Sequence, residues 1–270
     1  MSNDVQETTE SGRILVALDA SPHSMTALRA AARLAAAMQA ELQGLYVEDA
    51  NLFKLCQTPF CREVSLLTAR VRQLETQMME RQMRVMASEM RRTLARVAAE
   101  LQVRWSFQVT RGGVEHELLA AAEQASLLSL GRTGWLAGRR LGSTTRAVME
   151  RTLRPLLILG TKEATTTSLT LIYNGSTSAD RALALAVRLA QKAHYAPHVL
   201  IVAPETLGDS LRIQVVRAFD AAGLHATIAL IKATDNLAAV LQRAADHSFV
   251  LPVEFSHLLP ELEGPVLLTP

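Results

Sequence analysis

The clearest chemistry in this sequence belongs to a loop of glycine, serine and threonine residues. Its members are Gly131, Gly134, Gly142, Ser143 and Thr144. An apolar run, 125–130, precedes the loop, and a segment typical of a helix, 146–152, follows it. Glycine lets the backbone approach a ligand where a Cβ would intrude, and a helix start presents free N–H groups to an anion. We interpret the loop as a phosphate cradle, with an ordinary surface loop and helix cap as the alternative.

Side chains around this loop add donors and positive charge. The hydroxyl donors are Ser143, Thr144 and Thr145, and the arginines are Arg132, Arg139, Arg140 and Arg146. The Gly-Lys-Ser/Thr ending of a Walker loop is absent from the sequence. The stretch therefore predicts anion binding without the P-loop arrangement.

Asp19 is the second residue whose position suggests a site. The run 13–19 is apolar and ends in this acid, the segment 24–38 predicts a helix, and 41–49 predicts a second strand. These segments make a βαβ unit. Ligands of doubly wound sheets bind where the strands end near the switch point, so we expect Asp19 beside the glycine loop. A helix cap or turn residue is the alternative for Asp19.

The chain repeats itself. Segment 14–21 aligns with 169–176, and Ala31-Ala-Arg-Leu-Ala35 and Leu45-Tyr-Val47 find their counterparts at the same offset of 155. The offset then falls to 121, where 107–131 aligns with 228–252, and to 110 for the last apolar runs. The sequence is therefore an internal duplication whose second copy is 34 residues shorter in the middle and 11 residues shorter at the glycine loop.

The extra segment of the first copy predicts a helix. Residues 61–101 contain neither glycine nor proline and are rich in helix-forming residues, although a bend or two helices fit as well as one rod. Five methionines fall between Met78 and Met90. We interpret them as core or dimer packing, with an adaptable partner surface as the alternative. Strands are then expected over 103–110, 125–130 and 155–159, with a helix over 114–124.

The composition argues against nucleic-acid binding and against a membrane span. The 270 residues carry a net charge of +2 and only 4% aromatic residues, which argues against a nucleic-acid surface. An apolar signal segment and an 18-residue uncharged apolar run are absent, so we expect a cytoplasmic protein without a membrane span. The two cysteines and seven histidines form no disulfide framework or metal spacing.

Five alternating strands and helices, Asp19, and the loop ending Gly142-Ser-Thr-Thr-Arg-Ala-Val-Met-Glu together resemble the universal stress protein family. The resemblance covers 13–160 well and 169–270 in eroded form. It implies two tandem α/β domains with Rossmann-like open parallel sheets, each of strand order 3-2-1-4-5. We expect a tail over 1–12, a first domain over 13–160, a linker over 161–168 and a degenerate second domain over 169–270. The end strands of the two domains should pair as antiparallel edges in an intramolecular pseudo-dimer.

The resemblance also implies a ligand, an adenine nucleotide with ATP as the first candidate, with or without Mg²⁺. Asp19 through its carboxylate and Val47 through its backbone would flank the adenosine, and Leu130 and Gly131 would lie by the ribose. The phosphates would be held by Gly134, Gly142, Ser143 and Thr144, with Arg132 adding charge. Seven residues separate Gly134 from Gly142, where ATP-binding members have nine.

The sequence thus predicts a stress-response regulator that binds one adenine nucleotide in its first repeat and acts through an unidentified protein partner or as a homodimer. The second repeat has Asn174 in place of Asp19 and Pro252 in place of Gly131, so it is not expected to bind nucleotide. A nucleotide-free interaction scaffold of the same fold is the alternative. A catalytic motif is not evident, and weak ATP hydrolysis stays open.

Overall fold

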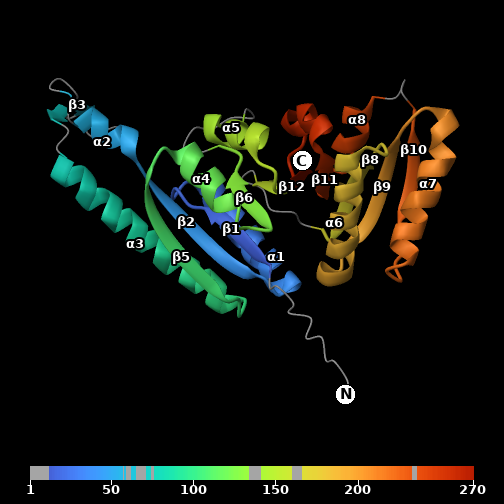
Figure 1. Cartoon of the computed structure of the whole chain (residues 1–270), viewed down its shortest axis with the longest axis horizontal. Coiled ribbons are helices and arrows are strands. Elements are labelled where there is room, and N and C mark those ends of the chain that lie inside the picture. The colour runs from blue at the N-terminus through green and yellow to red at the C-terminus, as the bar shows by residue number, and fades with distance from the viewer. Residues whose placement is uncertain are drawn as a thin grey trace, which may run out of the picture.

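The structure, a computed structural model, describes residues 12–56, 58, 62–64, 71–73, 76–133, 141–159, 166–232 and 236–270. Within them, one ten-stranded sheet runs through the molecule and helices cover both of its faces (Figure 1). The first repeat contains β1 (Arg13–Ala17), α1 (Pro22–Met38), β2 (Glu41–Asp49), α2 (Ala50–Cys56), β3 (Arg62–Val64), β4 (Val71–Gln73), α3 (Thr76–Glu100), β5 (Trp105–Gly112), α4 (Val114–Ala122), β6 (Leu127–Gly131), α5 (Ser143–Arg151) and β7 (Leu156–Leu159). The second contains β8 (Ser168–Tyr173), α6 (Thr177–Ala193), β9 (Ala196–Val202), α7 (Glu205–Asp220), β10 (Thr227–Ile231), α8 (Leu237–Gln242), β11 (Ser248–Pro252), the 3₁₀ helix η1 (Val253–Glu261) and β12 (Val266–Thr269).

The strand order confirms the predicted topology. The sheet runs β10-β9-β8-β11-β12-β7-β6-β1-β2-β5, so each half has the order 3-2-1-4-5. The strand registers also follow the sequence offsets. Ile14 pairs with Leu127 in the first repeat, and Leu169 pairs with Ser248 in the second. The α/β fold with two parallel half-sheets is therefore as expected.

The two halves meet through one antiparallel pair of strands, as predicted. Leu157 of β7 lies opposite Leu267 of β12, and the registers Val266↔Ile158 and Leu268↔Leu156 flank them. Each strand pairs in parallel with its own half on the other side. Both short apolar edges are thereby paired, which leaves neither as a free sheet edge.

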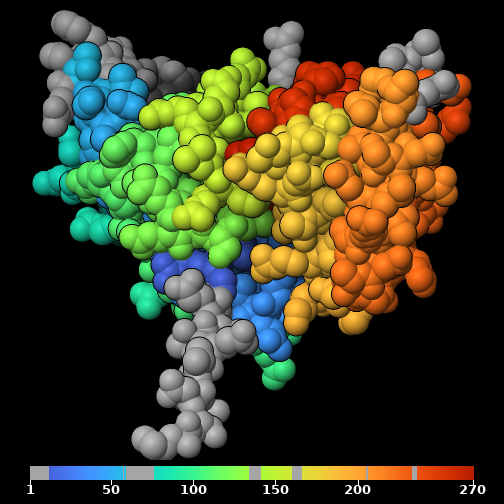
Figure 2. Space-filling model, turned by 45° about the vertical axis from the view of Figure 1, so that its right-hand side comes forward, coloured from blue at the N-terminus to red at the C-terminus, as the bar shows by residue number. Residues whose placement is uncertain are grey.

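Two layers of helices bury the sheet. On one face, α1, α3, α6 and α7 contribute to a core cluster that includes Leu28, Leu94 and Phe219. On the other face, α4, α5, α8 and η1 contribute to a cluster that includes Val148 and Leu258. Figure 2 shows the C-terminal segment, in red, between yellow-green atoms of the first repeat and gold atoms of the second. The second cluster thus continues across the junction.

The helix predicted over 61–101 is wrong in its first part. Two short antiparallel strands, β3 and β4, stand where its N-terminal third was expected, and α3 begins only at Thr76. Helix propensity dominates the composition there, but cross-strand pairing overrides this weak local preference. Two of the five methionines, Met83 and Met90, pack as interpreted, because they are buried in α3, which contacts the sheet, whereas Met78 is exposed. Of the helices described here, none is long and apolar enough to cross a membrane.

Candidate ligand-binding site

A cavity of about 840 Å³ opens at the carboxyl ends of β1, β2 and β6. This is within the usual range of small-molecule pockets. Seven of the nine predicted site residues line the cavity: Asp19, Val47, Leu130, Gly131, Gly142, Ser143 and Thr144. The sheet topology explains the gathering, because β1 and β6 are neighbours and both end at this edge.

The start of α1 forms one wall. Ser21 caps the helix, since its Oγ accepts a hydrogen bond from the Ser24 N–H at 3.2 Å. One carboxylate oxygen of Asp19 accepts the Ser21 N–H at 3.0 Å. The turn role that the sequence left open for Asp19 is thus present, and it coexists with a place in the cavity wall. The Asp19 side chain is exposed, so its remaining acceptor positions face outward from the turn.

Gly131, at the end of β6, lies in close contact with the backbone of the first turn of α1. A Cβ built at this position would lie 2.8 Å from His23 Cβ, 2.9 Å from the His23 carbonyl carbon and 3.1 Å from the Ser24 nitrogen. The end of β6 therefore rests directly on the first turn of α1. Glycine is required here because of this close approach, and the approach fixes two cavity walls relative to each other.

The start of α5 forms the opposite wall. Gly142 caps this helix and makes no side-chain cap hydrogen bond, so the first N–H groups of α5 have no such partner. Ser143 is exposed and Thr144 is half-buried at the cavity. The Thr145 hydroxyl instead donates to the Gly131 carbonyl at 2.9 Å. Thr145 lines the cavity, and its hydroxyl proton is engaged in this bond, which joins α5 to β6.

Arg132 does not line the cavity with its neighbours. Its side chain is buried, and its guanidinium donates to two carbonyls of the second repeat, Leu259 at 3.1 Å and Leu262 at 2.6 Å. Its predicted contribution of charge toward phosphate is therefore directed elsewhere. Gly134, Arg139 and Arg140 lie outside the described residues.

The electrostatics of the cavity are acidic at one end. Asp19 and Asp49 line it, and no lysine or arginine is among its lining residues in the described part of the chain. Burial raises the pKa of Tyr46, and the carboxylates of Glu48 and Asp19 raise it further, so this phenol stays protonated. Over the same described ranges, no group of three His, Cys, Asp or Glu residues could hold a metal ion.

Sequence reasoning missed several wall residues. They are Ala17, Leu18, Ser21, Ser24, Leu45, Tyr46, Asp49, Leu52, Val114, Leu118, Thr133 and Leu141. The Ser-Pro pair after Asp19 is a helix-start signal that could have placed Ser21. Asp49 ends the second strand, as Asp19 follows the first. Thr133 is notable because its hydroxyl is buried without a hydrogen-bond partner, an uncommon and costly state.

Three comparisons place the chain among known proteins. The sequence model of the universal stress protein family matches residues 10–160. No matching relative was found among curated proteins. A universal stress protein from Archaeoglobus fulgidus superposes with a TM-score of 0.74 at 15% identity over 96% of this chain and 98% of its own.

Two further solved structures are similar. A protein of unknown function from Pseudomonas aeruginosa PAO1 gives a TM-score of 0.59 at 14% identity, covering 96% of this chain and 92% of its own. A universal stress protein solved in complex with cAMP matches 56% of this chain and 98% of its own, at 20% identity and a TM-score of 0.39. The first two likenesses extend over both repeats.

Proposed function

Because this chain belongs to the universal stress protein family, we propose that it is a stress-response regulator that binds an adenine nucleotide in its first repeat. The observation that carries the proposal is the cavity at the ends of β1 and β6, which is lined by Gly131, Gly142, Asp19 and the start of α5. ATP is the first candidate, with or without Mg²⁺. Binding rather than catalysis is proposed.

The cavity is lined by acceptors, donors and apolar groups. The carboxylates of Asp19, after β1, and Asp49, at the end of β2, are acceptors suited to ribose hydroxyls and base amino groups. The N–H groups after Gly142 and the hydroxyls of Ser143 and Thr144 are donors suited to phosphate oxygens. Val47 and Leu130 add apolar lining. A nucleoside phosphate presents partners for all three kinds of group.

One alternative is a nucleotide-free scaffold of the same fold. It is favoured by the shortened loop and by the Thr145 hydroxyl, which is already bonded to Gly131. In that case the start of α5 is structural and function lies in surface contacts with a protein partner.

Mass spectrometry of small molecules released from denatured, freshly purified protein distinguishes nucleotide binding from the nucleotide-free scaffold. Co-purified adenine nucleotide supports the proposal. Isothermal titration of the full chain with ATP, with and without Mg²⁺, then gives the stoichiometry, for which we expect about one nucleotide per chain.

Two variants test whether the nucleotide binds in this cavity. Gly142→Val places a branched side chain at the cavity wall and should abolish binding. Asp19→Asn retains the turn acceptor, since Asn174 makes the same bond to Ser176 in the second repeat, but it removes the charge. Loss of one charged hydrogen bond predicts binding about 10-fold weaker or more. Asp246→Asn, outside the cavity wall, is the matched control. Equal affinity in all four proteins would refute the assignment.

A further inference from the structure

The second repeat contains the same helix start as the cavity wall of the first. Asn174 accepts the Ser176 N–H at 3.1 Å, as Asp19 accepts that of Ser21. Ser176 then caps α6 by accepting the Ala179 N–H at 3.1 Å. The local frame for a ligand at the end of β8 is therefore retained.

A carboxylate of the chain itself occupies this frame. Glu254, in the first turn of η1, accepts hydrogen bonds from the hydroxyls of Ser176 and Ser178, the latter at 2.6 Å, and from the Asn174 amide at 3.2 Å. Burial alone would raise the pKa of Glu254, but these hydrogen bonds and one from its own backbone lower it overall. Asn174 suits this arrangement, because an aspartate there would place a second carboxylate beside Glu254.

The other end of η1 is held from the first repeat. The Arg132 guanidinium binds the carbonyls of Leu259 and Leu262, at and just beyond the last turn of η1. The Arg132 backbone meanwhile closes the base of the glycine loop, since its carbonyl accepts the Gly142 N–H at 2.9 Å. Its neighbours Gly131 and Thr133 both line the cavity.

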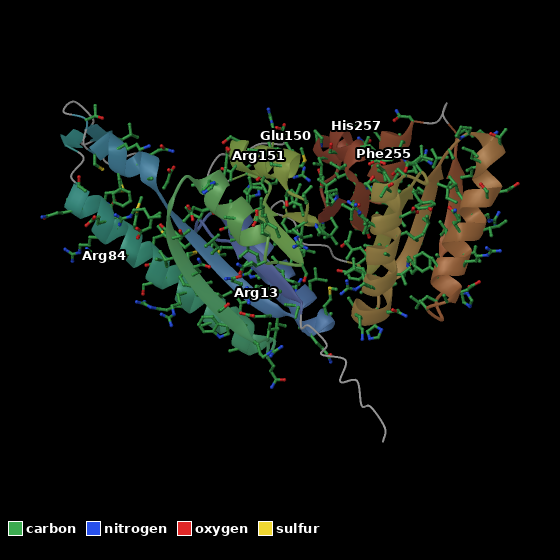
Figure 3. All side chains as sticks on the ribbon, viewed as in Figure 1. Arg13, Arg84, Glu150, Arg151, Phe255 and His257 are labelled. Carbon is green, nitrogen blue, oxygen red and sulfur yellow. The ribbon has the colours of Figure 1, made fainter. Side chains whose placement is uncertain are left out.

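Packing supports the same connection. Val148 of α5 and the η1 residues Leu258 and Leu259 belong to one core cluster. Figure 3 shows Glu150 and Arg151 on α5 and Phe255 and His257 on η1, on the two sides of the junction of the repeats. The helix that begins at the cavity and the segment that carries Glu254 are thus parts of one packed unit.

We propose that Glu254 is an anion of the chain itself that fills the ligand position of the second repeat, and that its seating is coupled through Arg132 to the backbone of Gly142 at the start of α5. The two states are Glu254 seated on the start of α6 and Glu254 released. A ligand that holds Gly142 in place also holds Arg132 and η1, and so keeps Glu254 seated. By linkage, release of Glu254 loosens the backbone at Gly142. The coupling rests on the proposed function only for the identity of the ligand.

Hydrogen exchange on the full chain tests this without ligand first. Glu254→Gln should speed amide exchange at 177–180 and also at 142–146, in the other repeat. Arg132→Met should speed exchange at 253–262 and at 142–146, by a factor within the usual coupling range of about 5 to 150. Arg154→Met is the matched control, since this arginine donates to the Glu123 carbonyl inside the first repeat. It should leave 253–262 unchanged. If Arg132→Met does not fold, Arg132→Lys and Glu254→Gln carry the test.

Saturating ATP provides the second arm. In the wild type, exchange should slow at 142–146 and at 253–262, and in Arg132→Met only at 142–146. Slowing confined to 142–146 in the wild type would overturn the coupling and leave nucleotide binding standing. No slowing anywhere would overturn nucleotide binding, and the ligand-free comparison would still decide the coupling. Unchanged exchange at 142–146 in ligand-free Glu254→Gln refutes it.

Discussion

Replacing Gly131 by alanine tests the contact on which the cavity is built. The new Cβ would lie 2.8 Å from His23 Cβ, about 0.7 Å inside the shortest favourable carbon–carbon separation of about 3.5 Å. Two of its three nearest atoms belong to the α1 backbone, so no side-chain rotation relieves the clash. The end of β6 and the first turn of α1 must therefore move apart.

The magnitude follows from two opposing effects. Overpacking of a core contact costs about 1–3 kcal/mol, and alanine regains about 0.4–1 kcal/mol by restricting the unfolded chain. A net loss of about 1–2 kcal/mol corresponds to a melting temperature lower by roughly 2–8 °C for a domain of this size. Binding of a fluorescent ATP analogue should weaken as well, because both displaced segments line the cavity.

Gly113→Ala is the matched control. Nothing lies within 4 Å of a Cβ at this position, and its φ of −74° suits alanine. Gly113 is the N-cap of α4, where alanine is a poorer cap than glycine, so we expect a loss of about 0.5 kcal/mol and no loss from a clash. Differential scanning calorimetry of both variants gives the comparison. A Gly131→Ala protein as stable as Gly113→Ala would show that β6 and α1 do not pack as described.

Three further outcomes are expected. Because the pKa of Glu254 is lowered, its contribution to stability is complete above the ordinary glutamate pKa and is lost as the pH falls through the lowered value. When unfolding is measured over a range of pH, wild type should therefore be more stable than Glu254→Gln at neutral pH, and the two free energies of unfolding should converge in strong acid. Burial and the hydrogen bond to Asp180 raise the pKa of Tyr173, so ultraviolet titration should find its phenolate absorbance only well above pH 10 (about the usual value), and Tyr173→Phe should reduce the late component, to which Tyr46 also contributes. Leu157→Ala, at the junction of the two half-sheets, should cost about 2–5 kcal/mol and lower the urea midpoint of both repeats, whereas loss from the first repeat alone would argue against a shared core.

Periodicity and repetition predicted the main strands and the duplication, and the family resemblance implied the strand order. The strand of 41–49 is found at those bounds, and the antiparallel pairing of the two end strands follows from two apolar edges that need partners. Local patterns carry this information because each strand is a short apolar run between turn signals. The β3–β4 pair was not predicted, because its residues favour helix by composition and form strands only through pairing with each other.

The candidate site was predicted in its backbone positions more than in its side chains. Gly131 and Gly142 lie where the loop pattern puts them. Arg132, by contrast, bonds to Leu259 and does not line the cavity, and Thr145 lines it with a hydroxyl that already donates to Gly131. Side-chain direction depends on partners far along the chain, and the partner of Arg132 is 127 positions away in the other repeat. A single sequence holds no local signal for such a contact.

Because β7 and β12 belong to one chain, their pairing does not weaken when the protein is diluted. Two separate subunits paired through these strands would part as their concentration fell, whereas the edges here are always present together at a high effective concentration. The melting temperature of this pairing should accordingly not depend on protein concentration. Each molecule also carries one repeat with an open cavity and one whose frame is filled by Glu254, a composition that exchange of subunits between molecules cannot alter.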